Sequence, residues 1–179
     1  MYGNEQIGDG RHVSLVRITH GNLVIPIVRA SGARLSVLVA EDNTVVRLVT
    51  RSLLLSRWQM DLRMVSDGAA AVDAALLWSF DVVLMDLQMP VMDGFAATGT
   101  IRKFEAENPS RRRTPVVAYT STPAAEVATE IRASGMDAIL AKPAGAHAMC
   151  ATLHQWGAGK IARVGTAVCD RAMAQPAHA

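Results

Sequence analysis

Short apolar runs alternate with stretches of helical spacing from residue 35 to about residue 154. The runs that favour strands are LSVLVA (35–40), MDLRMV (60–65), DVVLM (81–85), PVVAYT (115–120) and DAILA (137–141). The segments between them are apolar or alanine-rich with helical spacing, which predicts helices from Thr44 and over residues 72–80, 94–106, 124–133 and 144–154. Five strands that alternate with five helices predict an α/β fold, in which a doubly wound parallel sheet is covered by helices on both faces.

Polar residues follow the predicted strands at the edge where such a sheet binds its ligands. Glu41 and Asp42 come after the first strand and Asp86 after the third. The fourth strand ends in Thr120, and Lys142 follows the fifth. The topology therefore predicts a cluster of three carboxylates, a hydroxyl and an ammonium at one edge of the sheet.

This combination of groups suits phosphoryl chemistry. Three neighbouring carboxylates repel one another, and a hard divalent cation such as Mg²⁺, which prefers oxygen ligands, compensates their charge. Lys142 adds a mobile positive charge, and the hydroxyl of Thr120 can donate to an anionic oxygen. With Asp86 as nucleophile, these groups could hold a phosphoryl group, because its transfer depends mostly on positioning and charge neutralisation.

Several of these residues also have an ordinary structural interpretation. Asp42 or Asn43 could cap the helix that begins at Thr44. The pair Asp93-Gly94 favours a turn over a site. Taken alone, Thr120 would be interpreted as an ordinary strand residue and Lys142 as a surface lysine. The predicted topology, however, places both of them and the three acids at the same edge of the sheet.

Composition describes a globular chain whose charge identifies no partner. Half of the residues are hydrophobic and 19% are charged, and the net charge of +2 is too small to indicate binding to nucleic acid or membrane. The basic run Arg111-Arg112-Arg113 is interpreted as a solvated loop. Two cysteines do not make a disulfide framework, no apolar run reaches the roughly 18 residues of a membrane helix, and the N-terminus lacks a signal-peptide pattern. A cytoplasmic protein without a membrane segment is therefore expected.

The two ends of the chain carry weaker patterns than the middle. Residues 1–34 form an extension or linker in which HVSLVRI and NLVIPIVRA could be strands or an extended arm, followed by the linker-like SGAR. Residues 35–157 make up one domain, and residues 158–179 form a tail, expected to be flexible, with no clear period.

The motifs VLVAEDN, DVVLMDLQMPVMDG, TPVVAYTS and GMDAILAKP resemble the receiver domain of two-component response regulators over about residues 35–156. They look most like the receivers of hybrid sensor histidine kinases and phosphorelays. The resemblance implies a flavodoxin-like sheet with strand order 2-1-3-4-5. It also implies that a histidine kinase or a histidine phosphotransfer protein donates a phosphoryl group from phosphohistidine, and that the response is a change in partner interactions.

The resemblance also assigns a role to each site residue. Asp86 is the phosphoacceptor, and Thr120 and Lys142 contact the phosphoryl oxygens. Mg²⁺ is bound by Asp42 and Asp86, by Glu41 mainly through water, and by the backbone carbonyl of Gln88. Pro143 follows a cis peptide bond of the kind common at this place in the family.

One position departs from the family pattern. Ile139 stands where an aromatic ring usually moves inward as the threonine turns towards phosphate, and an isoleucine cannot fill or vacate the same volume as that ring. Thr122 and Gln88 lie where family members tune the lifetime of the acyl phosphate.

Three alternatives bear on the function. A kinase is not supported, because no histidine precedes an acid as in the usual phosphoacceptor box and the glycine-rich ATP-binding boxes are missing. A receiver-like binding module that works without phosphate is an open alternative. An aspartyl-phosphate hydrolase is disfavoured, because Gln88 stands where such enzymes carry a second acid. We therefore expect self-catalysed phosphorylation and dephosphorylation, not a conventional enzyme, in a stand-alone receiver or the C-terminal receiver of a hybrid kinase, without direct DNA binding.

Overall fold

The computed structural model describes residues 3–6, 12–20, 23–31, 34–58 and 60–157. Its central sheet consists of β4 (Leu35–Ala40), β5 (Met60–Val65), β6 (Val82–Met85), β7 (Val116–Thr120) and β8 (Ala138–Ala141). Its helices are α1 (Thr44–Arg57), α2 (Gly68–Leu77), α3 (Gly94–Glu107), α4 (Ala124–Ser134) and α5 (Ala146–Trp156).

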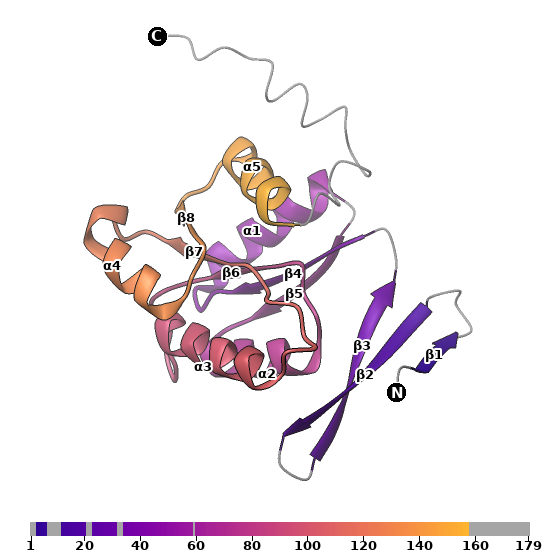
Figure 1. Ribbon diagram of the computed structural model, residues 1–179. Helices are drawn as coiled ribbons and strands as arrows, with labels where there is room; N and C mark the ends of the chain where they lie inside the picture. Colours follow the sequence, from indigo (N-terminus) through magenta and orange to yellow (C-terminus); the bar gives the residue numbers. More distant parts are fainter. Residues whose placement is uncertain (1–2, 7–11, 21–22, 32–33, 59, 158–179) are drawn as a thin grey trace.

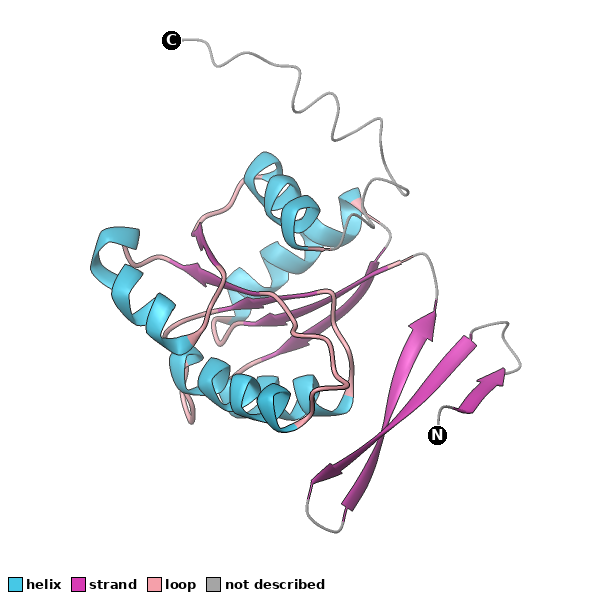
Figure 2. Ribbon diagram, viewed as in Figure 1, coloured by secondary structure: helices cyan, strands magenta, loops and turns pink. Residues whose placement is uncertain are grey.

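The five strands pair in parallel in the order β5-β4-β6-β7-β8. Numbered along this sheet, the order is 2-1-3-4-5, so the predicted doubly wound topology is confirmed. Figures 1 and 2 show helices on both faces of the sheet, with α1 and α5 on one face and α2, α3 and α4 on the other.

Burial follows from this layering. All four residues of β6, the central strand, have no exposed surface, as expected for a strand covered on both faces. One apolar cluster lies between the sheet and α2, α3 and α4, and a second lies between the sheet and α1 and α5. The two clusters fix the sheet between its helical layers and so fix the edge where the strands end.

Short polar side chains begin the helices that follow three of the strands. Asn43 Oδ1 accepts hydrogen bonds from the backbone N–H groups of Val45 and Val46, at 3.0 and 3.2 Å, so the capping interpretation holds for Asn43. Asp67 and Asp93 cap α2 and α3 in the same way. Asp93 is thus the cap of α3 and Gly94 its first residue, so the pair forms a helix start where a turn was predicted.

One sequence expectation was wrong, and a second holds for only part of its residues. The helical spacing that ran to Phe80 overshoots α2, which ends at Leu77. The basic run is not simply a solvated loop. The guanidinium of Arg111 donates to the carbonyls of Leu76 (2.9 Å), Trp78 (2.6 Å) and Ala75, where the last turn of α2 lacks backbone donors.

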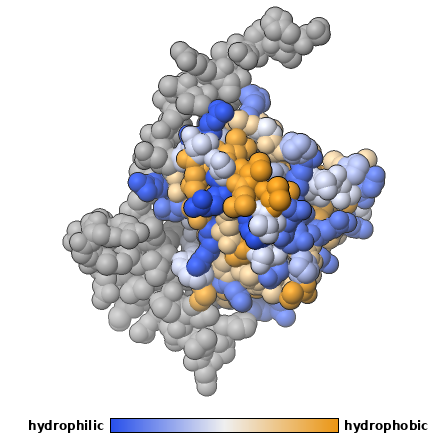
Figure 3. Space-filling model, turned by 180° about the vertical axis from the view of Figure 1, so that it is seen from behind, coloured by the Kyte–Doolittle hydropathy of each residue, from blue (hydrophilic) through white to orange (hydrophobic). Residues whose placement is uncertain are grey.

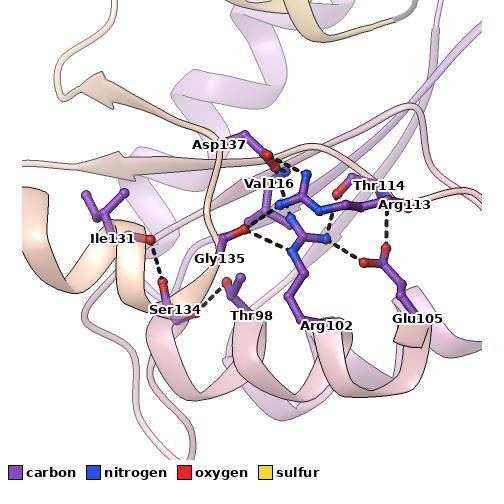
Figure 4. Close-up of polar contacts among 11 residues, drawn as sticks. Thr98, Arg102, Glu105, Arg113, Thr114, Val116, Ile131, Ser134, Gly135 and Asp137 are labelled. Atoms are coloured by element: carbon purple, nitrogen blue, oxygen red, sulfur yellow. Dashed lines mark hydrogen bonds and ion pairs between the residues drawn. The ribbon is translucent and has the colours of Figure 1, made fainter. Parts of the chain in front are cut away.

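A second arginine network joins α3 to the amino-terminal ends of β7 and β8 (Figure 4). Arg102 donates to the carbonyls of Gly135 and Thr114 and to the carboxylate of Asp137, each at 2.9 Å. Arg113 pairs with the same carboxylate and donates to the Gly135 carbonyl at 2.8 Å. These contacts brace the edge of the sheet opposite to the one that carries the candidate site.

The segment before the central domain contains a separate antiparallel sheet. Its strands β1 (Gly3–Gln6), β2 (His12–His20) and β3 (Leu23–Ser31) pair in that order. Of the two possibilities for this segment, strands are therefore correct. The expected C-terminal tail, residues 158–179, lies outside the described residues. No helix among the described residues is both long enough and apolar enough to cross a bilayer.

Candidate functional site

The carboxyl ends of β4, β6, β7 and β8 lie side by side and deliver the predicted residues to one edge. Beyond the paired ends of β4 and β6, the N–H of Asp86 donates to the Ala40 carbonyl at 3.0 Å. The N–H of Lys142 donates to the Thr120 carbonyl at 2.8 Å. Backbone hydrogen bonds thus continue one residue past the strands and hold the functional residues in register.

The structure brings the three acids together. One carboxylate oxygen from each of Glu41, Asp42 and Asp86 lies within 4.8 Å of the others. Glu41 is 1% exposed and Asp86 is 7% exposed, whereas Asp42 is exposed to solvent. Two of the three acids are therefore in the protein interior, where their charges need compensation from the chain or from a bound cation.

Lys142 joins the two buried acids. Its Nζ lies 2.5 Å from Glu41 Oε2 and 2.6 Å from Asp86 Oδ2. With all four groups ionised, one ammonium balances one of three carboxylates and leaves two negative charges. A cluster of oxygen donors with this excess fits a hard divalent cation such as Mg²⁺.

Burial and pairing act on the titration of these groups. Burial raises the pKa of Glu41 above its ordinary value, and the ammonium of Lys142 opposes that shift without cancelling it. For Lys142, burial alone would lower the pKa, but Asp86 and Glu41 outweigh burial and raise it. Lys142 is therefore held in its charged ammonium form.

The remaining predicted residues lie at or just after the carboxyl ends of β6, β7 and β8. Thr120 is 1% exposed, and its Oγ1 accepts a hydrogen bond from the Thr122 N–H at 3.0 Å. The Gln88 N–H donates to Asp86 Oδ1 at 3.4 Å, while the role of the Gln88 carbonyl stays a prediction. The peptide bond between Lys142 and Pro143 is cis, as the resemblance implied.

Ile139 lies on β8, opposite Ala118 of β7. Its side chain is half-buried and packs against the apolar cluster under α2, α3 and α4. An aliphatic side chain therefore occupies the position at which the family usually places its mobile ring.

The sequence pattern did not identify two further residues at this edge, Arg47 and Gly94, as part of the site. Arg47, one turn into α1, donates to the backbone carbonyls of Glu41 (2.8 Å) and Asp42 (3.2 Å) and so fixes the loop that carries both acids. Gly94 packs so closely on Asp86 that a Cβ would lie 2.1 Å from its carbonyl oxygen. The Asp93-Gly94 pair signalled a turn, but nothing local to Arg47 indicated its contacts.

Comparisons with known proteins agree with this geometry. Residues 37–154 match the family of the response regulator receiver domain. The chain is 38% identical to the sensor protein GacS of Pseudomonas syringae over 120 residues, which cover 67% of this chain and 13% of GacS. It is also 38% identical to the peroxide stress-activated histidine kinase mak1 of Schizosaccharomyces pombe over 114 residues, covering 60% of this chain and 7% of mak1. The chain thus spans only a small part of these relatives.

Solved receiver structures are similar as well. The receiver of the sensor histidine kinase PA1611 from Pseudomonas aeruginosa, solved with magnesium in its active-site cleft, has a TM-score of 0.60 and 32% identity and covers 70% of this chain and 98% of that one. The receiver of Ssk1 from Saccharomyces cerevisiae, crystallised with the phosphotransfer protein Ypd1, has a TM-score of 0.64 and 28% identity, with coverage of 72% and 92%. From its matched residues, its strand order and its acidic strand ends, the chain belongs to the response regulator receiver domain family of two-component signalling.

Proposed function

We propose that this receiver accepts a phosphoryl group on Asp86 from a phosphohistidine of a partner protein. The observation that supports this best is the placement of Lys142 Nζ, which contacts both Asp86 and the buried Glu41 within a three-carboxylate cluster. A nucleophilic carboxylate, an ammonium fixed beside it and an oxygen-rich cation site are the parts that phosphoryl transfer requires.

In the proposed reaction, a carboxylate oxygen of Asp86 attacks phosphorus, and the bond from phosphorus to the imidazole nitrogen breaks. The electron pair of that bond returns to the imidazole, and an acyl phosphate forms on Asp86. Lys142 would then have phosphoryl oxygens as its anionic partner. Thr120 ends β7, the strand next to β6, and its hydroxyl would donate to another phosphoryl oxygen. The nucleophilic carboxylate and the groups that would bind the phosphoryl oxygens are therefore already held in place at the ends of the strands.

We assign the cation to Asp42, Glu41, Asp86 and the Gln88 carbonyl, with Mg²⁺ as the ion. It would supply positive charge to the phosphoryl oxygens. The donor set supports this, because carboxylate and carbonyl oxygens are what Mg²⁺ prefers. The magnesium in the PA1611 receiver is consistent with the assignment.

A histidine kinase or a histidine phosphotransfer protein is the proposed phosphodonor. The Ssk1 receiver was crystallised with such a phosphotransfer protein, Ypd1. In this chain, α1 starts directly after the acids of the first loop. Its first half carries three exposed apolar side chains, Val45, Leu48 and Val49, at 69%, 59% and 62% exposure. We call these three residues the α1 surface.

Figure 3 shows apolar side chains gathered on the face of the molecule that carries α1. Exposed apolar groups at this spacing form one stripe of a helix, which suits packing against a helix of another protein. The α1 surface adjoins the candidate site, so a partner that packs there would bring its histidine near Asp86.

Phosphotransfer profiling tests the proposal. Purified histidine kinases and phosphotransfer proteins, labelled on histidine, are mixed with the wild type, with Asp86→Asn and with Asp73→Asn, an exposed acid of α2 that serves as the control. We expect transfer to the wild type and to Asp73→Asn but not to Asp86→Asn. Undiminished labelling of Asp86→Asn would refute the assignment of the acceptor.

The second candidate is a receiver that binds its partner without phosphate. Ile139 favours it, because the ring whose movement normally reports phosphorylation is absent. Equal affinity of wild type and Asp86→Asn for a partner, measured with and without phosphodonor, would support this candidate over phosphorylation-dependent switching.

We also propose the limits of the domain, the kind of protein to which it belongs and its location in the cell. We place the receiver at residues 35–157, with an extension before it and a tail after it, either standing alone or as the C-terminal receiver of a hybrid kinase. A cytoplasmic location is proposed from the phosphodonor alone.

A further inference from the structure

Tyr119 precedes Thr120 on β7 and lies on the opposite face of the sheet. Consecutive strand residues point to opposite faces, so Thr120 faces the layer of α4 and Tyr119 faces the layer of α1 and α5. Tyr119 is 4% exposed and belongs to the apolar cluster that includes Leu54 of α1 and Met149 of α5. A phenol ring is therefore buried directly beneath the edge that carries the site.

Two contacts of Tyr119 reach in different directions. The Nζ of Lys142 lies 5.0 Å from the centre of its ring, within the range of a cation–π interaction. Its hydroxyl is 3.3 Å from Oγ1 of Thr50 on α1, a residue that is only 2% exposed. The side chain thus contacts both the ammonium beside Asp86 and the helix that bears the α1 surface.

We propose that Tyr119 is a positioning residue for Lys142 and that, through Thr50, it links the state of Asp86 to α1. The inference rests on the proposed function, since it concerns the ammonium that would bind the phosphoryl group. The ring contacts Nζ at 5.0 Å, while the carboxylates of Asp86 and Glu41 hold the same nitrogen at 2.6 and 2.5 Å.

Phosphorylation would change the contacts that Lys142 Nζ makes with Asp86, Glu41 and the ring of Tyr119. A phosphoryl group on Asp86 replaces a carboxylate charge with nearly two negative charges placed farther from the strand. The ammonium follows that charge and alters its contact with the ring. Because the ring is packed and its hydroxyl contacts Thr50, the adjustment reaches α1, which lies on the face of the sheet opposite to Ile139.

Two variants at Tyr119 distinguish the contribution of its aromatic ring from that of its hydroxyl. Tyr119→Leu removes the π face, and we expect labelling by acetyl phosphate and Mg²⁺ to slow by about three- to thirtyfold, the range that a desolvated cation–π contact supports. Tyr119→Phe restores the π face and should restore most of the rate. A residue that only filled space would leave the rate per folded molecule the same in all three proteins, with folding checked by circular dichroism.

Nuclear magnetic resonance tests the link to α1. The chain has two tyrosines, Tyr2 and Tyr119, so ring-labelled tyrosine in a Tyr2→Phe background gives the signal of Tyr119 alone. We expect this signal to shift when Asp86 is phosphorylated. We expect the accompanying shifts of α1 backbone amides to shrink in Thr50→Val, which keeps the size of the side chain and loses the hydroxyl.

The outcomes distinguish this inference from the proposed function. If Asp86 is labelled while the Tyr119 signal stays in place, or if Tyr119→Leu is labelled at the wild-type rate, the positioning role is overturned and the phosphoacceptor role stands. If α1 amides respond fully in Thr50→Val, the link to α1 is overturned. If no protein is labelled on Asp86, the proposed function itself fails.

Discussion

Replacing Lys142 by methionine tests how far the candidate site depends on one ammonium. The substitution keeps most of the aliphatic side chain and removes the charge that contacts Glu41 and Asp86 at 2.5 and 2.6 Å. Glu41 is 1% exposed, so its carboxylate then has no cationic partner among these groups and little water. Breaking such a buried pair costs about 3–5 kcal/mol of the free energy of unfolding.

The raised pKa of Glu41 favours the lower end of that range. Burial already shifts this pKa upward while Lys142 is present, and removing the ammonium shifts it further in the same direction. Glu41 can then take up a proton and escape part of the penalty. We expect a loss of about 3 kcal/mol, or a fall in Tm of roughly 6–12 °C for a chain of this size.

Magnesium should offset part of this loss. A cation that binds only the folded state stabilises by about 2.7 kcal/mol at a hundred times its Kd. Because Lys142→Met leaves the carboxylates with one positive charge fewer, Mg²⁺ should raise the Tm of the variant more than that of the wild type. Thermal unfolding, followed by circular dichroism with EDTA and with increasing Mg²⁺, measures both effects.

The control is Lys103→Met, which removes an exposed lysine on α3. Its free energy of unfolding should change by no more than about 0.5 kcal/mol. Mg²⁺ should raise its Tm by the same amount as it raises the Tm of the wild type. Equal stability of Lys142→Met and wild type in EDTA, or equal gains from Mg²⁺ in both, would refute the charge balance described for the site.

Three further substitutions test other features of the structure. Leu48→Glu on the α1 surface should slow phosphotransfer from a partner protein by at least about fivefold and leave labelling by acetyl phosphate unchanged, because only the first reaction needs docking. Gly94→Ala should lower the free energy of unfolding by about 1–3 kcal/mol in urea titrations, because its Cβ would lie 2.1 Å from a backbone oxygen. Arg111→Met should cost about 1.5–3 kcal/mol in the same assay, because the last carbonyls of α2 lose a charged donor.

Each of these variants has a matched control in the chain. Leu77→Glu, exposed on α2 in the opposite layer, should leave phosphotransfer unchanged; a loss equal to that of Leu48→Glu would argue against docking at α1. Gly99→Ala meets nothing within 4 Å and should stabilise by about 0.5–1 kcal/mol. Arg112→Met, at an exposed position, should have little effect, and a similar loss in both arginine variants would contradict the capping of α2.

The sequence was enough to predict the positions of the strand ends. In a parallel sheet the carboxyl ends share one edge, so Asp86 and Lys142, 56 residues apart, could be placed together without any contact being known. The cap at Asn43 was also local, because a short polar side chain there can reach only the first turn of the helix.

Contacts across long stretches of chain could not be predicted. Arg111 caps a helix that lies 33 to 36 residues before it, and its sequence neighbours give no sign of this. Phe80 continues the apolar spacing of α2 because it packs on the same cluster from the following loop, so periodicity alone could not place the end of the helix. Tyr119 was overlooked because its neighbour Thr120 matched the motif, whereas its own contacts lie on the other face of the sheet.

Labelling of Asp86 by a small phosphodonor tests the proposed chemistry most directly, because it needs no partner protein. The chain is incubated with acetyl phosphate and Mg²⁺, the acyl phosphate is trapped by borohydride reduction, and the modified residue is identified by tandem mass spectrometry. We predict one modified residue, Asp86, and loss of the modification in EDTA and in Asp86→Asn. Modification at another residue, or labelling that persists in Asp86→Asn, would contradict the assignment of Asp86 as the phosphoacceptor.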